Sequence, residues 1–253
     1  MPQVYFGPVQ ERNSDYAEAS ANNGRWPLGH TLVLPDGRVF RFTRAGAAAR
    51  VAANLYQSIV MVADHANKAC DVARAVGATA ISATLGATAA AVDLFAEGWV
   101  NTQDVDGEGY NYRIKRAHAA AAAHAAVLAS GIITVNLEPG ETVQVALTTS
   151  SEVTFTRNRF AAVIIHDSPA TADLVGVSPG VAAANRYYWS QTKGEACVLV
   201  QGTLVASDIA VPSATVDGAV MPSAAIETDG PIVGRVRHLG ANGEHGLVDL
   251  TIE

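Results

Sequence analysis

Hydrophobic and polar residues alternate along much of the chain, which is typical of β-strands with one buried face. The clearest example is a hairpin, in which residues 31–34 and 38–42 flank a Pro-Asp-Gly turn. Proline fixes φ and an Asp-Gly pair tolerates positive φ, so this tripeptide reverses the chain tightly. A second hairpin is predicted at 232–239 and 247–252, on either side of an Asn-Gly turn.

Further strands are predicted where apolar and β-branched residues recur between Gly, Pro, Asn, Asp and Ser, often roughly ten residues apart. These segments are 79–85, 110–115, 132–137, 143–147, 153–157, 162–166, 187–191 and 197–200. Such a series of short strands predicts a mainly β fold, built from antiparallel β-sandwich or barrel domains.

Two alanine-rich segments leave the choice between helix and strand open. In 45–75, alanine favours a helix and Val51, Leu55 and Ile59 fall near helical spacing, yet 59–62 equally suits a short buried strand. In 117–130, the alanine content favours a helix without a decisive apolar stripe. We therefore expect at most a short alanine-rich helix beside the strands.

The first 26 residues are predicted to form an extended N-terminal arm, because they are polar except for the isolated aromatics Tyr5, Phe6 and Trp26. Such a segment cannot pack against itself, so it is either a frayed terminus or lies across a neighbouring molecule. Turn-forming residues near 139–150 suggest a boundary between a β-rich domain with alanine-rich segments, 27–147, and a C-terminal β-sandwich or barrel domain, 148–253.

Composition and charge narrow the classes of partner. The chain of 253 residues is 49% hydrophobic and 16% charged, and its 17 Lys and Arg against 24 Asp and Glu give a net charge of −7. Without a basic run, nucleic-acid binding is not expected. The uncharged segments 75–92 and 117–137 lack the density of Leu, Ile and Phe of inserted helices, so we expect a soluble chain without a membrane contact. The N-terminus also lacks the regions of a secretory signal.

One motif resembles a catalytic site. Residues 176–180, Gly-Val-Ser-Pro-Gly, match the nucleophile elbow of serine hydrolases. In that elbow the N–H that follows the serine stabilises the oxyanion, but here the next residue is Pro179, which has no N–H. The segment is therefore predicted to be a Ser-Pro turn. We expect no catalytic residues and no enzymatic activity.

Metal and cofactor sites are not expected either. Residues 104–109 have the composition of a calcium loop, but the twelfth position falls on Lys115, a cation, so an acidic turn is predicted. His118 and His124 are six positions apart, and the pair at 238 and 245 lacks a third ligand. The two cysteines, at 70 and 197, have no metal-ligand spacing. Reduced, buried thiols are favoured over a single long-range disulfide.

A run of three aromatics, Tyr187, Tyr188 and Trp189, stands out in a chain that is only 6% aromatic. It either lines a ligand cleft or, as we favour, forms a core strand with one face at an interface. Together with Tyr5, Phe6 and Trp26, these three are the candidate interface residues.

Several stretches resemble a known family. They include GEGYNYRIKRAHAA, AANRYYWSQTKGEACVLVQGTLV and GEHGLVDLTIE. These resemble the head decoration, or cement, proteins of tailed bacteriophages, over most of residues 28–253. The resemblance implies a β-rich, commonly trimeric protein on the outer capsid surface that clamps neighbouring coat subunits. Related sequences have Val and Thr where this chain has Ala in 117–130, which counts against a helix there.

Two classes of function are therefore expected. The first is a structural virion protein, made in the host cytoplasm, that staples neighbouring subunits of the major capsid protein and assembles with itself as a homotrimer. Several weak contacts on one symmetric particle would give a slow net off-rate. The alternative is a host-attachment or glycan-binding tail or fibre module, with 187–189 as the sugar platform.

Overall fold

The fold is mainly β and antiparallel, as the hydrophobic alternation predicts. The computed structural model describes residues 5–6, 26–116, 123–223, 230–238 and 240–253. In these residues there is no α-helix, and the helical element is a single 3-10 turn, η1 (Ala63–His65). The chain divides into two compact units, Met1–Val60 with Arg159–Glu253, and Met61–Asn158.

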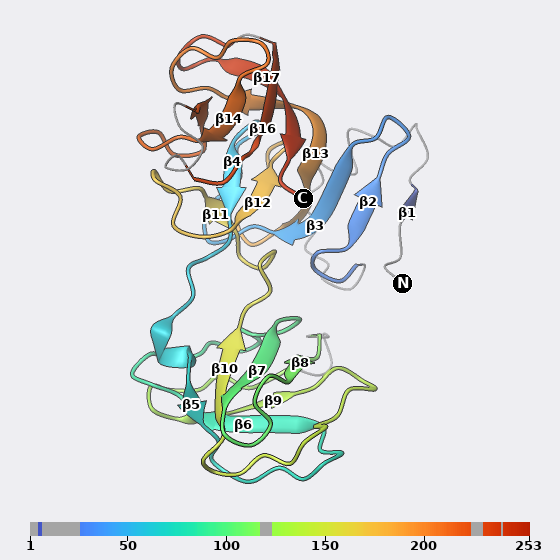
Figure 1. The fold of residues 1–253 in the computed structure, drawn as a ribbon, viewed down its shortest axis with the longest axis vertical. Coiled ribbons are helices and arrows are strands. Elements are labelled where there is room, and N and C mark those ends of the chain that lie inside the picture. Colours follow the sequence, from blue (N-terminus) through green and yellow to red (C-terminus); the bar gives the residue numbers. More distant parts are fainter. Residues whose placement is uncertain (1–4, 7–25, 117–122, 224–229, 239) are drawn as a thin grey trace. The chain divides into compact units, whose positions relative to one another are not determined.

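The first unit contains one sheet of eleven strands (Figure 1). Its main path runs in the order β1-β2-β3-β13-β17-β16-β14-β15, and β4, β11 and β12 branch from it. The bounds are β1 Tyr5–Phe6, β2 Thr31–Val33, β3 Val39–Arg44, β4 Leu55–Gln57, β11 Ile164–Ile165, β12 Leu174–Val177, β13 Tyr187–Leu199, β14 Ile209–Pro212, β15 Val220–Pro222, β16 Gly234–His238 and β17 His245–Thr251.

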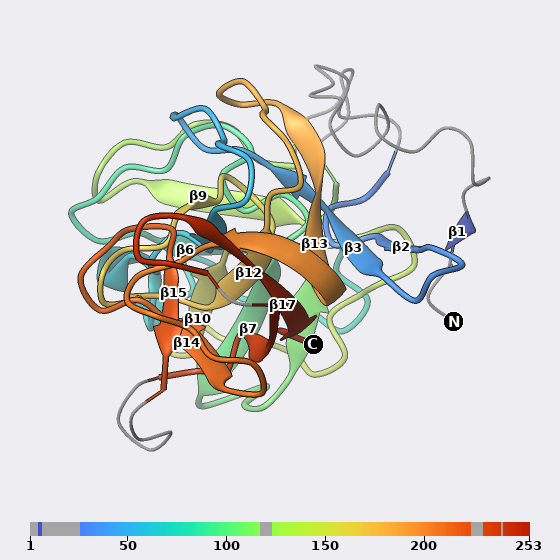
Figure 2. The ribbon, with the colours of Figure 1, turned by 90° about the horizontal axis from the view of Figure 1, so that it is seen from above.

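The strand β13 links the two halves of this sheet, because it pairs with β3 along its first half and with β17 along its second (Figures 1 and 2). The register shifts between Gln191 and Lys193, where the strand bulges. The buried Gln191 amide nitrogen lies within hydrogen-bond distance of the carbonyl oxygens of Lys193, Gly194 and Glu195, at 3.2, 3.2 and 2.9 Å. The separate strands predicted at 187–191 and 197–200 are therefore parts of one strand.

Both predicted hairpins are confirmed. β2 pairs with β3 in antiparallel register around the Pro-Asp-Gly turn, and β16 pairs with β17 around the Asn-Gly turn. In β17, Val248 and Leu250 are fully buried while Asp249 and Thr251 on the other face are partly or largely exposed. This alternation places β17 over the main core of the unit, which also includes Val198, Val236 and Leu204.

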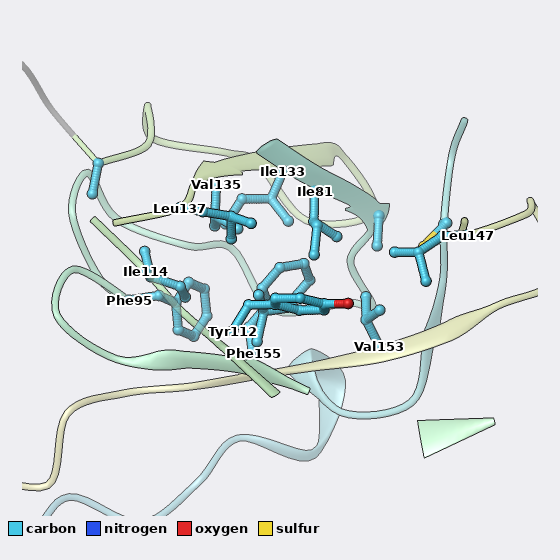
Figure 3. Close-up of a cluster of buried hydrophobic side chains, with 14 of the residues drawn as sticks. Ile81, Phe95, Tyr112, Ile114, Ile133, Val135, Leu137, Leu147, Val153 and Phe155 are labelled. Atoms are coloured by element: carbon cyan, nitrogen blue, oxygen red, sulfur yellow. The ribbon is translucent and has the colours of Figure 1, made fainter. Parts of the chain in front are cut away.

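The second unit consists of two sheets with a core between them. A four-stranded sheet has the order β5-β10-β7-β8, and a two-stranded sheet pairs β6 with β9. The bounds are β5 Lys68–Ala69, β6 Ala80–Thr84, β7 Trp99–Asp104, β8 Asn111–Arg113, β9 Ile132–Asn136 and β10 Glu152–Thr156. Figure 3 shows how Ile81 and Ile133 of the smaller sheet face Tyr112 and Phe155 of the larger one. This two-layer packing is a small β-sandwich.

The division into units differs from the predicted domain boundary near 139–150. β4, near the start of the chain, pairs with β11 and β12, so residues before position 60 share a sheet with residues after 159. The strand β10 pairs with β7 and thus belongs to the second unit. The predicted domains 27–147 and 148–253 therefore each combine parts of both units, because strand pairing here is not sequential.

Two local predictions also differ from the structure. Residues 143–147 form no strand: Val143 and Leu147 are buried, but each anchors a loop through backbone bonds with Ala78 and Arg74. In 45–75 the structure contains β4, η1 and β5 and no α-helix. Alanine propensity is overridden there because the apolar residues contribute to sheet cores. In the other alanine-rich segment, residues 117–122 lie outside the described residues.

The core of the second unit buries two histidines on either side of one phenylalanine. The Phe95 ring meets His65 at 5.2 Å in an edge geometry and His124 at 5.4 Å, measured between centroids. Nε2 of His124 accepts a 3.0 Å hydrogen bond from the Phe95 backbone N–H, and Nδ1 donates to the Ala125 carbonyl at 2.8 Å. This pattern requires a neutral ring.

Burial lowers the pKa of both histidines below the ordinary value of 6.5. The positive charges of Arg157 and Lys68 lower the pKa of His65 further, while the Thr88 carbonyl and Asp64 raise it. The Ala125 carbonyl and Asp93 raise the pKa of His124, but burial has the larger effect. The folded unit therefore holds both rings neutral at a pH where the unfolded chain would protonate them.

We expect the protein to lose stability as the pH falls below 6.5, the ordinary histidine pKa. The unfolded histidines then bind protons that the folded ones reject, so the free energy of unfolding falls by at most about 1.4 kcal/mol per pH unit for each histidine. The loss stops once the pH is below the folded pKa. Urea unfolding between pH 7.5 and 5 measures this, and His124→Gln should flatten the pH dependence.

The matched control is His245→Gln, which removes an exposed histidine from β17. It should leave the pH dependence of wild type in place. A free energy of unfolding that stays constant from pH 7.5 to 5 would contradict the proposed role of the buried rings.

Candidate functional site

Three of the predicted interface residues meet in one aromatic cluster in the first unit. Tyr187 stacks on Phe42 of β3 at 5.4 Å, and Trp189 meets the same ring edge-on at 5.2 Å. Trp26 stacks on His30 at 4.8 Å, and His30 lies 6.4 Å from Trp189, between ring centroids. The cluster forms because Tyr187 and Trp189 alternate with Tyr188 on β13 and so project on the same side.

Most of this cluster is internal packing. Trp189 is 6% exposed and Phe42 is 5% exposed, while Trp26 and Tyr187 are half-buried at its rim. The prediction that this run forms a core strand agrees with these burials. Sequence reasoning missed Phe42 and His30 as members of the cluster, although Phe42 already belonged to an alternating strand, which was the available signal.

Tyr188 belongs to the opposite face of β13, where it is 1% exposed. Burial raises the pKa of its phenol strongly. The same buried region holds Arg50, also 1% exposed, whose guanidinium carbon lies 4.6 Å from the centre of the Tyr56 ring. Nη2 of Arg50 donates to the Ala48 carbonyl at 2.5 Å. A cation–π contact and this hydrogen bond thus offset part of the cost of burying the charge.

The arm residues Tyr5 and Phe6 form β1, which extends the sheet of the same chain. β1 pairs in parallel with β2, with Tyr5 opposite Leu32 and Phe6 opposite Val33. A strand added to a sheet edge is held by main-chain hydrogen bonds and needs little side-chain specificity. Residues 5–6 of the predicted arm thus lie along the edge of β2.

The hydrolase-like segment, residues 176–180, ends β12 and continues into a bend at the exposed Pro179. Ser178 is fully buried, and its hydroxyl donates a 2.7 Å hydrogen bond to the Gly180 carbonyl. Its backbone N–H donates to the Asn54 carbonyl at 3.1 Å. These bonds fix the serine within a turn between antiparallel strands, as the Ser-Pro turn prediction expects.

The metal-like features are dispersed. In the described part of the chain, no three His, Cys, Asp or Glu side chains converge as metal ligands. The acidic segment 104–109 ends β7 and turns into β8, and Asp104 accepts the Val105 N–H at 2.8 Å. His118 lies outside the described residues. Asp104 thus caps its own turn through a local hydrogen bond.

The two cysteines are free thiols, as predicted, but only one of them is buried. Cys70 is 3% exposed in the core of the second unit, and burial raises the pKa of its thiol. Cys197 is exposed, contrary to the prediction. It lies on the outer face of β13, because its neighbours Ala196 and Val198 point into the core.

An open groove of about 540 Å³ lies beside the bulge of β13. Its charged side chains largely pair with one another: Arg38 contacts Asp36 at 2.8 Å, and Arg237 contacts Glu195 and Asp249 at 3.8 and 3.4 Å. Because these exposed pairs compensate each other, the groove offers little net charge to a ligand.

No protein-family model, curated protein or solved structure matches the chain. Among the described residues, no helix has the length and apolar content that crossing a bilayer requires.

The buried position of Trp189 predicts a structural role that a surface anchor would not have. Trp189→Ala should lower the free energy of unfolding by about 3–5 kcal/mol, because a large buried ring is replaced by a cavity. Trp99→Ala, at a 38% exposed position, should cost less than about 1 kcal/mol. Urea unfolding followed by far-UV circular dichroism compares them, and equal costs for the two would contradict the assignment of Trp189 to the core.

Proposed function

We propose that the protein is a decoration protein of a tailed bacteriophage, which binds the outer capsid surface and staples neighbouring major capsid subunits. The observation that carries this proposal is the pairing of β1 with the edge of β2. An arm that docks by strand addition can take the same kind of edge on an adjacent molecule. The mainly antiparallel β fold is also what the resemblance to decoration proteins implies.

The strength of such stapling comes from repetition. A two-residue parallel strand makes few hydrogen bonds, so one arm alone binds weakly. Many copies on one symmetric particle, and three arms in a homotrimer, make dissociation slow. The net charge of −7 suits an outer layer, since like charges keep particles dispersed. The proposed partners are thus the major capsid protein and further copies of this chain, on the virion surface.

A host-attachment or glycan-binding module is the second candidate. The run 187–189 does not supply its sugar platform, because Tyr188 and Trp189 are buried. An exposed tryptophan on a sheet face of the other unit, Trp99 of β7, favours glycan binding instead.

Deletion of residues 2–25 tests the arm. This variant keeps Trp26 and its aromatic cluster, so we expect the β circular dichroism and the unfolding midpoint to stay near wild type. We expect it to lose retention on capsids that are assembled from the major capsid protein of the same phage. Co-sedimentation measures the bound ratio, and light scattering measures whether the free protein has three times the 26.2 kDa chain mass.

The control adds the missing segment back. A synthetic peptide of residues 2–25 should compete with wild type for capsids, whereas a peptide of the same composition in scrambled order should not. If the truncated variant is retained on capsids as well as wild type, the arm hypothesis is contradicted. A full-length protein that ignores capsids would overturn the decoration proposal itself.

A further inference from the structure

The outer face of the four-stranded sheet in the second unit carries an unusual set of side chains. On β7 and β8, Val100 and Tyr112 are opposite each other and point into the core. Because side chains alternate along a strand, the residues between them point outward. The strands β10, β7 and β8 run side by side in Figure 1 and form the support for this face.

Four outward residues of β7 and β8 form two cross-strand pairs. Trp99 is opposite Arg113, and Asn101 is opposite Asn111. Directly opposite side chains in an antiparallel pair have Cβ atoms about 4.5–5.5 Å apart, so each pair presents its groups together. Gln103 continues the row on β7 and is exposed.

Trp99 and Arg113 form the distinctive part of this surface. Trp99 is 38% exposed, and the Arg113 guanidinium carbon lies 5.6 Å from the centre of its ring. Among the described residues, no carboxylate lies within ion-pair distance of the Arg113 guanidinium. The Glu141 carboxylate accepts the Arg113 backbone N–H at 2.5 Å, but none of the ion pairs among the described residues engages the guanidinium. The face therefore offers an aromatic ring, a guanidinium outside any ion pair and two side-chain amides.

We propose that this face, the Trp99 platform (Trp99, Asn101, Asn111 and Arg113), binds an acidic glycan. In this proposal the C–H edges of a sugar ring pack against the face of the Trp99 indole opposite the one over which the Arg113 guanidinium lies. A guanidinium binds a carboxylate through two parallel hydrogen bonds, which fits the carboxylate of a uronate sugar. Side-chain amides donate and accept at once, as neighbouring hydroxyls require.

The composition of the platform fits a polysaccharide better than a protein or a nucleic acid. A protein interface has a dehydrated apolar centre, but here Trp99 lies between Arg113 and Thr156 on the neighbouring strands and beside Asn101 on its own strand. A nucleic-acid site needs several cations along a backbone, and Arg113 is the one charged residue of the platform. A single cation with polar amides matches a ligand that has many hydroxyls and a carboxylate at intervals.

The proposal is independent of capsid binding, since the platform belongs to residues 61–158 and the arm to the other unit. The sequence gives a signal for it that was missed: in Trp99-Val-Asn-Thr-Gln-Asp, the alternate positions after the tryptophan carry amides instead of charges. Failure of either proposal therefore leaves the other intact.

Calorimetric titration of the full chain tests the platform. The probes are oligosaccharides of guluronate, mannuronate and galacturonate, with cellohexaose as a neutral glycan and poly-glutamate as an anionic chain without sugar rings. We expect at least one uronate oligosaccharide to bind more tightly than both comparison probes. The affinity should fall with added salt, because a surface ion pair is screened.

Three variants locate the binding. Trp99→Ala should weaken binding about tenfold, through loss of the stacking contact. Arg113→Met should weaken binding similarly and remove most of the salt dependence. Tyr110→Ala is the control, because Tyr110 is a 42% exposed aromatic of the same unit that stacks on Tyr112, away from the platform.

A fourth variant, Trp99→Phe, guards against a folding defect, since it keeps an aromatic ring and should keep most of the affinity. The proposal is overturned if no uronate oligosaccharide binds, if poly-glutamate or cellohexaose binds as well as the uronates, or if Tyr110→Ala weakens binding as much as Trp99→Ala does.

Discussion

The first unit depends on the continuity of β13 through its bulge. The 13-residue strand β13 pairs with β3 along its first part and with β17 along its second, and its register with β3 shifts between Gln191 and Lys193. The buried side-chain amide of Gln191 faces the carbonyl oxygens of Lys193, Gly194 and Glu195, directly after this shift, and so holds the bulged segment. Gly194 follows with φ of +83°, a backbone conformation that glycine adopts without strain. The aromatic cluster and the edge that receives β1 both belong to the part of the sheet that pairs with β13 through β3.

The two proposed binding surfaces would bind their partners through different kinds of interaction. The arm acts through the backbone of a sheet edge, so its affinity per contact is low and its effect depends on the number of copies. The proposed Trp99 platform acts through specific side chains on a sheet, so single substitutions are expected to weaken its affinity measurably. A virion surface protein that holds its capsid through one unit and a bacterial glycan through the other would combine both expected classes of function.

The sequence by itself determined the local structure. The alternation in 38–42 and 247–252 and the turn residues between the strands were sufficient for both hairpins, because register and turn type are local properties. The same alternation and turn residues were sufficient to predict a mainly β fold, since many short strands separated by polar turns pack into few architectures other than sandwiches and barrels. The missing N–H of Pro179 argued correctly for a turn. For the aromatic run 187–189, the burial of Tyr188 and Trp189 confirms the predicted core strand, while the predicted interface on one face of it stays a prediction.

Only the tertiary structure decided which strands pair, and hence how the units divide. The pairing of β4 with β11 and β12 joins residues more than 100 positions apart, and no local pattern encodes such a contact. The same holds for the segment 143–147, where Val143 and Leu147 are as apolar as a strand would need, yet they anchor a loop. The exposure of Trp99 was not predictable from the sequence either, because the exposed fraction of a side chain depends on which other parts of the chain cover it. Burial and long-range pairing are properties of the assembled core, which forms by packing that propensity does not specify.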